Sequence, residues 1–514
     1  MLQITTRINF EQKGEIIMMK TRIAAFLLAA LTLVPAVMTS CGGDTPAADN
    51  DQTQPIDATA AVTDAATEPV DMLDARLTVD DGVADKDYNG AAFRIVTCDG
   101  QTGYYYVEAE TGSVIDDAIF RRNSKVEERF NVNIEVTLDE GYADTSRQIS
   151  NTVKAGDDVI ELVAMHVIEC ALLAIKNNFR NWYDIPSINF EQPWWSESTI
   201  RDLSYNGIAP VAIGDFVLSA IANTYCTFYN KNLAANYDLP NMYDVVKEGK
   251  WTLDYVISTT KDIYQDLNGN GEVDTEDFFG YASDTRSNMN AYLWAFNNPI
   301  FTRDGDKLVY SYKSEKINNI VAKLVDTFSV YQGISTDFGA SWHYGRNLFM
   351  ESRAIFANGT LGHSLTALAD MTDDIGFLPY PKWDEAQEEY YTMVDGSHQA
   401  LAVPTTASNV EMIGAVTEVL NAESWKLVVP AYYDVALKVK ATRDTESVEM
   451  IDLVVNSRMF DFGYVYDGWG GPSFLLAEFV KTKNTDFEST YAKKEKGITK
   501  QYDKVVEFFE NFND

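Results

Sequence analysis

The segment 266–277 carries oxygen-bearing side chains in the spacing of a calcium-binding loop. The expected ligand positions are Asp266, Asn268, Asn270, Glu272, Asp274 and Asp277. Hard oxygen ligands at alternate positions are what Ca²⁺ prefers, and Gly271 permits the sharp turn of such a loop. Glu272 is expected to supply its backbone carbonyl, and Val273 is expected to pack inward. Because Asp277 is shorter than the usual glutamate, bidentate ligation stays open, as does the alternative of a plain polar turn.

Motifs of catalysis are missing from the sequence, which contains no HExxH, GxSxG, GxxxxGK[ST] or CxxC pattern. The histidines are too far apart for ligand spacing, so each is predicted to be a hydrogen-bonded structural residue; they are His166, His343, His363 and His398. Three cysteines of the body allow at most one disulfide and are predicted to be buried thiols: Cys98, Cys170 and Cys226. With 77 carboxylates, the sequence singles out no acid–base pair.

The N-terminal segment 1–40 has the features of an export signal. Lys20 and Arg22 precede an uncharged apolar run at 23–37, and small residues follow. These small residues, with Cys41 after them, resemble the bacterial lipoprotein box, which implies that Cys41 becomes a lipidated mature N-terminus. An ordinary cleaved signal with a chance cysteine is the alternative. Lipidation would tether the body to the membrane through the anchor alone.

Two further segments near the N-terminus are read from their composition. The codons for residues 13–15 (Lys-Gly-Glu) can have the sequence of a ribosome-binding site, and they lie a few codons before Met18 and Met19. We therefore hypothesise that translation begins at Met18 or Met19 and that residues 1–17 are not made. Residues 41–87 are rich in Asp, Thr, Ala and Pro. Such a segment buries too little apolar area to offset its ordering entropy, so it is predicted to be a disordered acidic tether.

The composition limits the partners of the chain. Lys and Arg total 41 against 77 Asp and Glu, which gives a net charge of −36. Nucleic acids and anionic lipid surfaces both require clustered positive charge, so neither is expected as a partner. The length of 514 residues and the 46% of hydrophobic residues predict a large globular body of two or three domains.

Strands and helices are predicted to alternate along the body. Short apolar runs at 91–97, 159–167 and 375–381 predict strands, and alternation at 132–136 predicts another. A capping box at Ser113 and Asp116 opens a predicted helix that ends near Phe130, and helical spacing returns at 502–512. Alternating strands and helices favour α/β lobes with mainly parallel sheets.

A series of segments along residues 88–514 resembles a known family. These are DDAIFRRNSKVEERFNVNI (116–134), PWWSESTIRDLSYNGIAPVAIGD (193–215), TFYNKNL (227–233), GKWTLDYV before the 266–277 loop, FMESRAIFANGTL (349–361) and DIGFLPYPKWDEAQEEYYT (374–392). Their order resembles the extracellular solute-binding proteins of bacterial ABC sugar transporters, in the maltose-binding-like group. The calcium loop after GKWTLD is frequent in a clostridial-type branch, where it looks structural.

The resemblance implies an α/β, two-lobed periplasmic-binding-protein-like (type II) fold with hinge crossovers. Lobe 1 is expected at 88–218 plus 355–399, and lobe 2 at 219–354 plus 400–514. It also implies a small carbohydrate ligand bound between the lobes, ABC permease subunits as partners, and a monomer. The alternatives to a sugar-binding transport component are a binder of another polar solute, a sensor of the same fold, or a surface glycan-degrading enzyme.

The site residues expected from the resemblance and from their positions are those suited to a sugar. Aromatic rings stack on the apolar faces of a sugar, and polar side chains bond its hydroxyls. The candidates are His166, Asp215, Trp294, Trp342, Tyr344, Asn358 and Trp469. For each aromatic residue, packing in the core remains the alternative.

Overall fold

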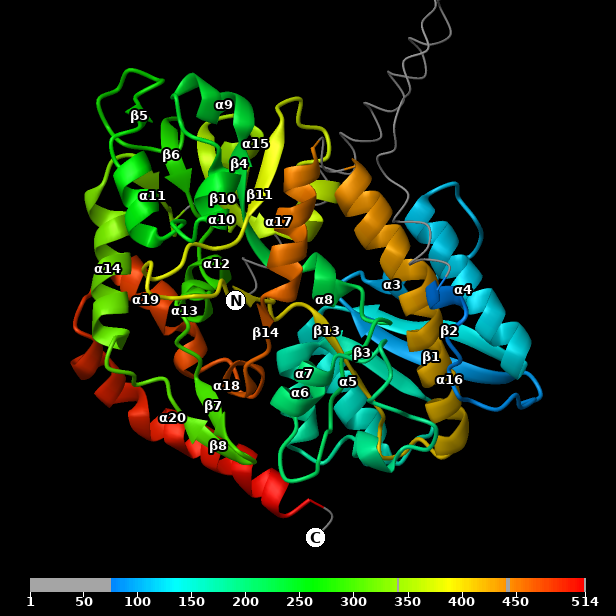
Figure 1. Ribbon diagram of the computed structural model, residues 1–514. Coiled ribbons are helices and arrows are strands. Elements are labelled where there is room, and N and C mark those ends of the chain that lie inside the picture. Colours follow the sequence, from blue (N-terminus) through cyan, green and yellow to red (C-terminus); the bar gives the residue numbers. More distant parts are fainter. Residues whose placement is uncertain (1–74, 340–341, 441–443, 513–514) are drawn as a thin grey trace, which may run out of the picture. The chain divides into compact units, whose positions relative to one another are not determined.

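The computed structural model describes residues 75–339, 342–440 and 444–512 (Figure 1). The predicted signal peptide, the lipidation site Cys41 and most of the tether lie outside these residues. Among the described residues, no helix has both the length and the apolar character required to cross a membrane. The cysteines at 98, 170 and 226 are buried free thiols, as predicted.

The first sheet has the strand order β13-β3-β1-β2. Its strands are β1 (Ala91–Cys98), β2 (Val132–Glu140), β3 (Leu162–His166) and β13 (Gln399–Ala402). β1 is parallel to both β2 and β3, and β13 is antiparallel to β3. The strands predicted at 91–97 and 132–136 are confirmed. The strand predicted at 159–167 is shorter, because helix α6 (Val167–Ala174) begins directly after His166.

Helix α4 (Val114–Phe130) shows how local sequence sets the elements around this sheet. The side chain of Ser113 accepts a hydrogen bond from the backbone N–H of Asp116, which confirms the predicted cap. Ile119 and Val126 lie on its buried face. Helix α16 (Val410–Glu423) packs against α4, although the two helices are far apart in sequence.

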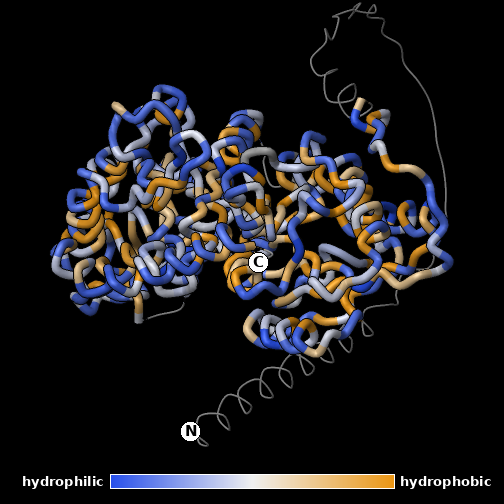
Figure 2. The backbone as a smooth tube through the Cα atoms, turned by 90° about the horizontal axis from the view of Figure 1, so that it is seen from below, coloured by the Kyte–Doolittle hydropathy of each residue, from blue (hydrophilic) through white to orange (hydrophobic). Residues whose placement is uncertain are grey.

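The second sheet has the order β11-β4-β10-β6-β5, with β9 also paired to β6. Its strands are β4 (Tyr225–Asn230), β5 (Tyr264–Gln265), β6 (Phe278–Ala282), β9 (Ile334–Ser335), β10 (Ala354–Thr360) and β11 (Ile375–Leu378). β6 is parallel to β9 and β10, whereas the other neighbours are antiparallel. The expectation of mainly parallel sheets is therefore wrong here, because β4 and β5 run opposite to β6 and β10. Every residue of β10 is buried, and Figure 2 shows hydrophobic and hydrophilic stretches alternating along the chain.

Strand pairing corrects the expected division into lobes. Residues 355–399 were expected in lobe 1, but they carry β11 and most of β10, which pair with β4 of the second sheet. Residues 400–514 were expected in lobe 2, but β13 pairs with β3 and α16 packs on α4. The chain returns to the second sheet with α17 (Thr445–Asn456), which packs against β11.

Two of the segments that pass between the two sheets lie side by side. One precedes β4 and contains Asn223; the other precedes β13 and contains Asp395. The backbone N–H of Asp395 donates to the carbonyl of Asn223 at 2.9 Å, and Thr224 bridges Val394. Two short parallel strands, β12 (Thr392–Met393) and β14 (Arg458–Met459), flank this point.

The remaining elements cover the sheets. The other helices are α3 (Thr102–Tyr105), α5 (Tyr142–Ala155), α7 (Glu197–Leu203), α8 (Ser219–Ala222), α9 (Lys231–Asn236), α10 (Met242–Lys247), α11 (Leu253–Thr260), α12 (Ser287–Asn290), α13 (Tyr292–Ala295), α14 (Ile317–Val330), α15 (Tyr344–Met350), α18 (Phe462–Val465), α19 (Leu475–Thr482) and α20 (Phe487–Glu510). β7 (Phe301–Asp304) and β8 (Lys307–Tyr310) form a hairpin. Short 3₁₀ turns are η1 (Trp182–Asp184), η2 (Leu361–Leu365) and η5 (Pro472–Phe474), and π-helical segments are η3 (Ser424–Val428) and η4 (Ala431–Lys440). The C-terminal helix predicted from 502–512 is confirmed by α20, which buries Tyr502, Val505 and Phe509.

Candidate ligand-binding site

Three of the four histidines of the chain lie near one carboxylate, Asp395, and the fourth lies beside one of these three. The negative charge of Asp395 acts on the rings of His166 and His363, and His398 Nδ1 lies 2.6 Å from the backbone oxygen of Asp395. The ring of His343 lies 6.2 Å from that of His363, centroid to centroid. These five residues are called the histidine cluster below. Sequence spacing did not predict this convergence.

The cluster forms where strands of both sheets end. His166 is the last residue of β3 in the first sheet, and His363 lies in η2, directly after β10 of the second sheet. Asp395 lies in a segment that joins the sheets. In open α/β sheets, ligands bind outside the carboxyl ends of strands. The topology therefore gathers polar groups where a ligand is expected.

Asp395 is fixed as an ionised acceptor. Burial opposes its ionisation, but hydrogen bonds from Ser397 and Tyr225 outweigh that effect and hold the pKa of Asp395 below its usual value. Ser397 donates through its backbone N–H at 2.9 Å and through its hydroxyl at 2.6 Å. The Tyr225 hydroxyl donates to the other carboxylate oxygen.

The buried rings of the cluster are neutral near pH 7. Burial lowers the pKa of His166, His363 and His398 to about 4 each. A neutral imidazole has one donor and one acceptor nitrogen. Nδ1 of His166 and Nε2 of His398 are buried and have no hydrogen-bond partner among the described residues. Such atoms are suited to a ligand that both donates and accepts hydrogen bonds, as a hydroxyl does.

Trp469 presents an aromatic ring beside His166, with 41% of its surface exposed. The two ring centroids are 5.1 Å apart, and the indole also stacks on Phe474 and Tyr142. The indole N–H donates to Glu169 Oε1 at 2.7 Å. These contacts fix the orientation of the ring while leaving part of it open to solvent.

The loop that carries Trp469 is held in a strained shape. Trp469 has a φ of 68°, in the left-handed region that favours glycine. The buried carboxylate of Asp467 accepts backbone N–H groups of Gly471 at 2.6 Å and Ser473 at 3.1 Å. Burial raises the pKa of Asp467 to about 6. A carboxylate that binds two loop amides compensates for the strain at Trp469.

Trp342, which directly precedes His343 in the chain, is a second exposed aromatic ring. Its surface is 63% exposed, and the Arg286 guanidinium carbon lies 4.0 Å from the ring centroid. Asp284, just after β6, is fully buried and lies 3.6 Å from His343 Nδ1. Its Oδ1 accepts the backbone N–H of Arg346 at 2.9 Å, whereas Oδ2 has no hydrogen-bond partner among the described residues.

The structure therefore places three of the seven expected ligand residues at the cluster: His166, Trp342 and Trp469. Three others, Trp294, Asn358 and Tyr344, are buried with their polar atoms bonded within the protein, so the two aromatic residues among them follow the alternative of packing in the core. Trp294 is 1% exposed, and its indole N–H donates to Asp461 at 2.8 Å. The amide of Asn358 is bonded to Tyr281, Tyr292 and Thr227 in the core, and the Tyr344 hydroxyl pairs with Ser335.

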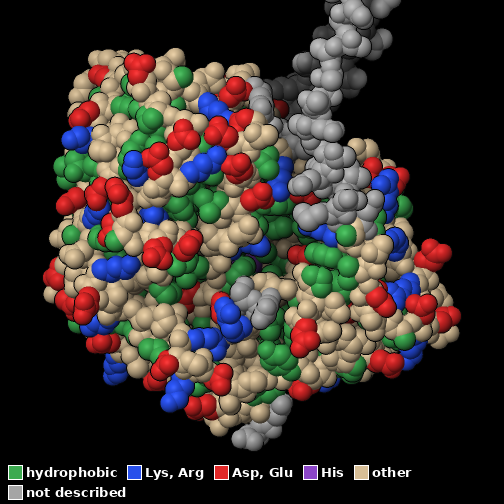
Figure 3. All heavy atoms as spheres, viewed as in Figure 1, with side chains coloured by type: hydrophobic (Ala, Val, Ile, Leu, Met, Phe, Trp, Pro, Cys, Tyr) green, Lys and Arg blue, Asp and Glu red, His purple; other side chains and the backbone are tan. Residues whose placement is uncertain are grey.

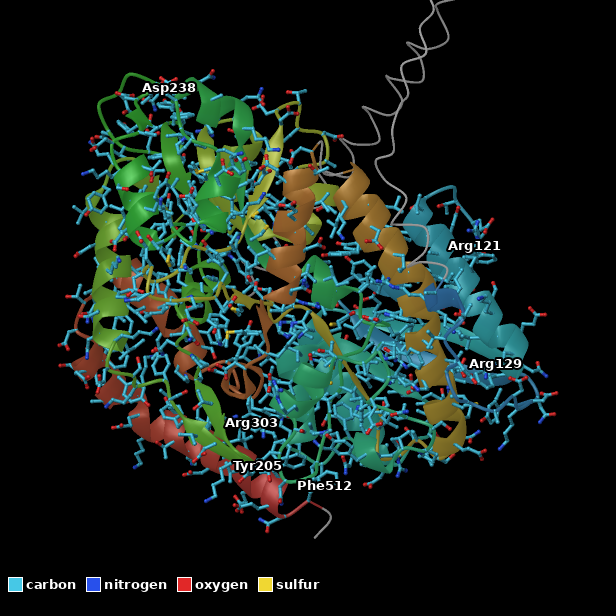
Figure 4. All side chains as sticks on the ribbon, viewed as in Figure 1. Arg121, Arg129, Tyr205, Asp238, Arg303 and Phe512 are labelled. Carbon is cyan, nitrogen blue, oxygen red and sulfur yellow. The ribbon has the colours of Figure 1, made fainter. Side chains whose placement is uncertain are left out.

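Asp215 lines a small cavity of about 190 Å³ with Trp195, Arg458 and Phe460. Burial raises the pKa of Asp215 to about 7, although Arg458 opposes this shift. None of the cluster residues lines this cavity. A larger cavity of about 810 Å³ lies beside Tyr205 and Arg303, which Figure 4 labels, and it also shares no lining residue with the cluster.

Sequence reasoning missed Asp395, His363 and Asp284 as members of the site. A weak signal existed for each of them. Asp284 follows a strand of the second sheet by two residues, and His363 follows another by three. Asp395 opens the segment DGSH, which is typical of a turn.

The calcium loop folds as a chain of turns that its own side chains stabilise. Asp266 accepts the backbone N–H groups of Gly269 at 2.7 Å and Gly271 at 2.8 Å. The side-chain amides of Asn268 and Asn270 both donate to Asp274 Oδ2, at 3.0 and 2.7 Å. Val273 is exposed, so the expectation that it packs inward is wrong.

The carboxylate and amide oxygens of the loop are ligands that a hard cation prefers, but Asp277 is not free to bind one. The Asp277 carboxylate is fully buried and accepts the Tyr264 hydroxyl and the backbone N–H groups of Leu267 and Asp274. It is therefore engaged by the protein itself. Among the described residues, no group of three or more His, Cys, Asp or Glu side chains is arranged to hold a metal ion. If the side-chain amides of Asn268 and Asn270 rotated by half a turn, their oxygens would take the places of the N–H groups that now face Asp274.

No family model and no curated protein matches the chain. Solved structures do. A solute-binding protein of an ABC transporter from Thermotoga lettingae, bound with α-D-tagatose, has 14% identity and a TM-score of 0.54, covering 81% of this chain and 100% of that one. The GacH receptor of Streptomyces glaucescens has 12% identity and a TM-score of 0.53, covering 80% and 98%. An ABC substrate-binding protein from Listeria monocytogenes, in complex with cycloalternan, has 12% identity and a TM-score of 0.51, covering 80% and 99%.

The chain has the fold of the two-lobed solute-binding proteins. The similarity extends over nearly the full length of each of these structures, so both sheets belong to the shared fold. The histidine cluster contains strand ends of both sheets and a segment between them. In two-lobed proteins that close around ligands, such a position is buried by closure.

Proposed function

We propose that the protein is the extracellular substrate-binding component of an ABC importer and that it binds a sugar or oligosaccharide at the histidine cluster. One observation carries the proposal: buried neutral histidines and an ionised Asp395 lie beside the partly exposed ring of Trp469, and the exposed Trp342 directly precedes His343 of the same cluster. Aromatic rings stack on sugar faces, and neutral donors and acceptors bond hydroxyls without an ionic preference. The shared fold supports the same assignment.

Binding without turnover is part of the proposal. The structures with the same fold are named as receptors or binding proteins. Asp395 is held ionised by its hydrogen bonds, whereas a general acid requires a raised pKa. Another polar solute, or a sensing role, would use the same cluster. A glycan-degrading enzyme would instead release shortened products.

The test is a thermal-shift screen against mono- and oligosaccharides, followed by calorimetry on every hit and mass spectrometry of the recovered ligand. We expect at least one saccharide to bind and to be recovered unchanged. Asp395→Asn should weaken that binding at least tenfold, because the amide offers one acceptor oxygen in place of two. Tyr183→Ala, at an exposed ring in the larger cavity, is the matched control and should bind normally. Shortened products would contradict the proposal.

We further propose that Cys41 carries a lipid and that the acidic tether links it to a monomeric body at the outer face of the cell membrane. The signal-like segment 1–40 and the small residues before Cys41 support this. ABC permease subunits are the proposed protein partners. Genes for two permease subunits next to the gene for this protein would support this partnership.

Calcium binding by the 266–277 loop is likewise proposed, with a structural role. Asp266, Asp274 and the two asparagine amides would hold the ion, and Glu272 would add its backbone carbonyl. The loop is tied to β10, because Arg353, directly before that strand, donates to the carbonyls of Thr275 and Asp277. A bound ion would therefore stabilise the second sheet.

A further inference from the structure

Two guanidinium groups lie on the second-sheet side of the histidine cluster. Arg346 lies close enough to His363 for its charge to lower the pKa of that ring, and its Nε is buried with no hydrogen-bond partner among the described residues. Burial lowers the pKa of the Arg346 guanidinium, although Asp284 opposes this shift. A buried N–H of a charged group without an acceptor is costly, so a ligand acceptor would relieve that cost.

Arg286 lies over Trp342, the residue that precedes His343 in the chain, and its backbone is strained. It has a φ of 59° and a ψ of −112°, a backbone conformation that a long side chain rarely adopts. Its guanidinium lies over Trp342 and is exposed rather than packed in the core. Residues in such strained conformations cluster at ligand sites, where the surrounding structure maintains them.

Neither guanidinium forms an ion pair with a carboxylate within the described part of the chain. Asp284 is the nearest acid in sequence to Arg286, yet its Oδ1 accepts the backbone N–H of Arg346 rather than the guanidinium. This is unusual in a chain with 77 acidic and 41 basic residues, and on the face drawn in Figure 3 carboxylates are spread among the basic groups. Two guanidiniums without a carboxylate ion pair among the described residues, one near His363 and one over Trp342, indicate an anionic ligand group.

We propose that the ligand is an acidic saccharide whose carboxylate binds Arg346 and Arg286. Its sugar hydroxyls would then bind Asp395 and His166 at the other side of the cluster. A guanidinium binds a planar carboxylate through two parallel hydrogen bonds, which a neutral hydroxymethyl group cannot reproduce. This inference rests on the proposed function, that the cluster binds a saccharide.

The experiment compares matched ligands that differ in one group. Oligogalacturonates, oligoglucuronates and oligomannuronates are titrated by calorimetry beside the corresponding neutral oligosaccharides. We expect at least one acidic member to bind tenfold or more tightly than its neutral partner. Raising the sodium chloride from 20 to 500 mM should reduce this preference, because salt screens the charge of an exposed guanidinium. A sulfated sugar of the same length shows whether any anion is sufficient, and binding equal to that of the uronate would overturn the carboxylate assignment.

Four variants and one control test the residues. Arg346→Gln and Arg286→Gln should each lower the ratio of acidic to neutral affinity at least tenfold, whereas Arg121→Gln, on the remote helix α4 (Figure 4), should not change it. Arg346→Lys keeps the charge but not the paired donors, so it should give an intermediate ratio even if Arg346→Gln does not fold. Arg286→Gly should raise the melting temperature while lowering the ratio, because it removes backbone strain together with the guanidinium.

The outcomes separate this inference from the proposed function. If neutral saccharides bind as tightly as acidic ones, the inference is overturned while the proposed function stands. If the arginine variants keep the wild-type ratio, the assigned residues are wrong. If no saccharide of either kind binds, the proposed function fails and the inference fails with it.

Discussion

The ring of His166 lies 5.1 Å from the ring of Trp469, although one residue ends a strand of the first sheet and the other lies in a loop of the C-terminal part of the chain. This contact joins a neutral hydrogen-bonding group to a partly exposed aromatic surface. A sugar presents the same two features, an apolar face and hydroxyls at its edge.

Trp469→Ala should weaken saccharide binding by about 2 kcal/mol, which is roughly thirtyfold, because the exposed part of the ring is the proposed stacking surface. The melting temperature should change little, since the ring is not enclosed by the core. Calorimetry and a thermal melt measure the two effects. Tyr183→Ala removes another exposed ring and should leave binding intact. Normal affinity in Trp469→Ala would show that the ring only packs against its neighbours.

Trp294→Ala should act on stability rather than on binding. Loss of a fully buried indole destabilises a protein by about 3–5 kcal/mol, and here the Asp461 carboxylate also loses a hydrogen-bond donor. Urea unfolding measures the difference. Trp342→Ala is the comparison, and it should unfold like the wild type because that ring is exposed. A stable Trp294→Ala variant with weakened binding would restore Trp294 to the ligand site.

The contrast between these tryptophans shows what the sequence could predict. Local patterns predicted β1, α4 and the loop 266–277, because their side chains repeat at a fixed period or spacing. The burial of Trp294 depends on Asp461, which lies far along the chain. Asp395, His166 and His363 also come from separate segments, so no local pattern brings them together. The predicted lobe boundaries were wrong for the same reason, because they depend on the sheet in which β10 pairs, and its partners β4 and β6 are far from it in the sequence.

Acid should destabilise the protein through its buried histidines. Burial lowers the folded-state pKa of His398 from 6.5 to about 4. Between these two values the unfolded state binds more protons, so the stabilisation is complete above pH 6.5 and is lost as the pH falls toward 4. His398→Asn keeps a donor near the Asp395 carbonyl but does not titrate. The stability of the wild type relative to this variant should therefore fall by up to about 3 kcal/mol over that range. Urea unfolding at several pH values measures it, and a constant difference would contradict the depressed pKa.

The tether provides a separate test of location. Cys41→Ser should release the protein into the medium, because lipidation of Cys41 is the proposed membrane attachment. Fractionation followed by immunoblotting measures the distribution. Cys98→Ser is a suitable control, since Cys98 is a buried thiol of the body and its replacement should leave the protein with the membrane. If Cys41→Ser stays with the membrane fraction after a salt wash, the anchor assignment is wrong.

Calcium should raise the melting temperature by a few degrees without being needed for the fold. An extracellular site of this kind binds near 10⁻⁴ M, by order of magnitude, so about 1 mM calcium would add roughly 1.4 kcal/mol of stability. Asp266→Ala should abolish the response, because this carboxylate both supplies a ligand and holds the Gly269 and Gly271 amides in place. Glu248→Gln, outside the loop, is the control. A chelator should lower the melting temperature and leave saccharide affinity within about twofold, since the loop contributes no residue to the histidine cluster. If the chelator removes binding while the protein stays folded, the ion belongs to the ligand site and its structural role is refuted.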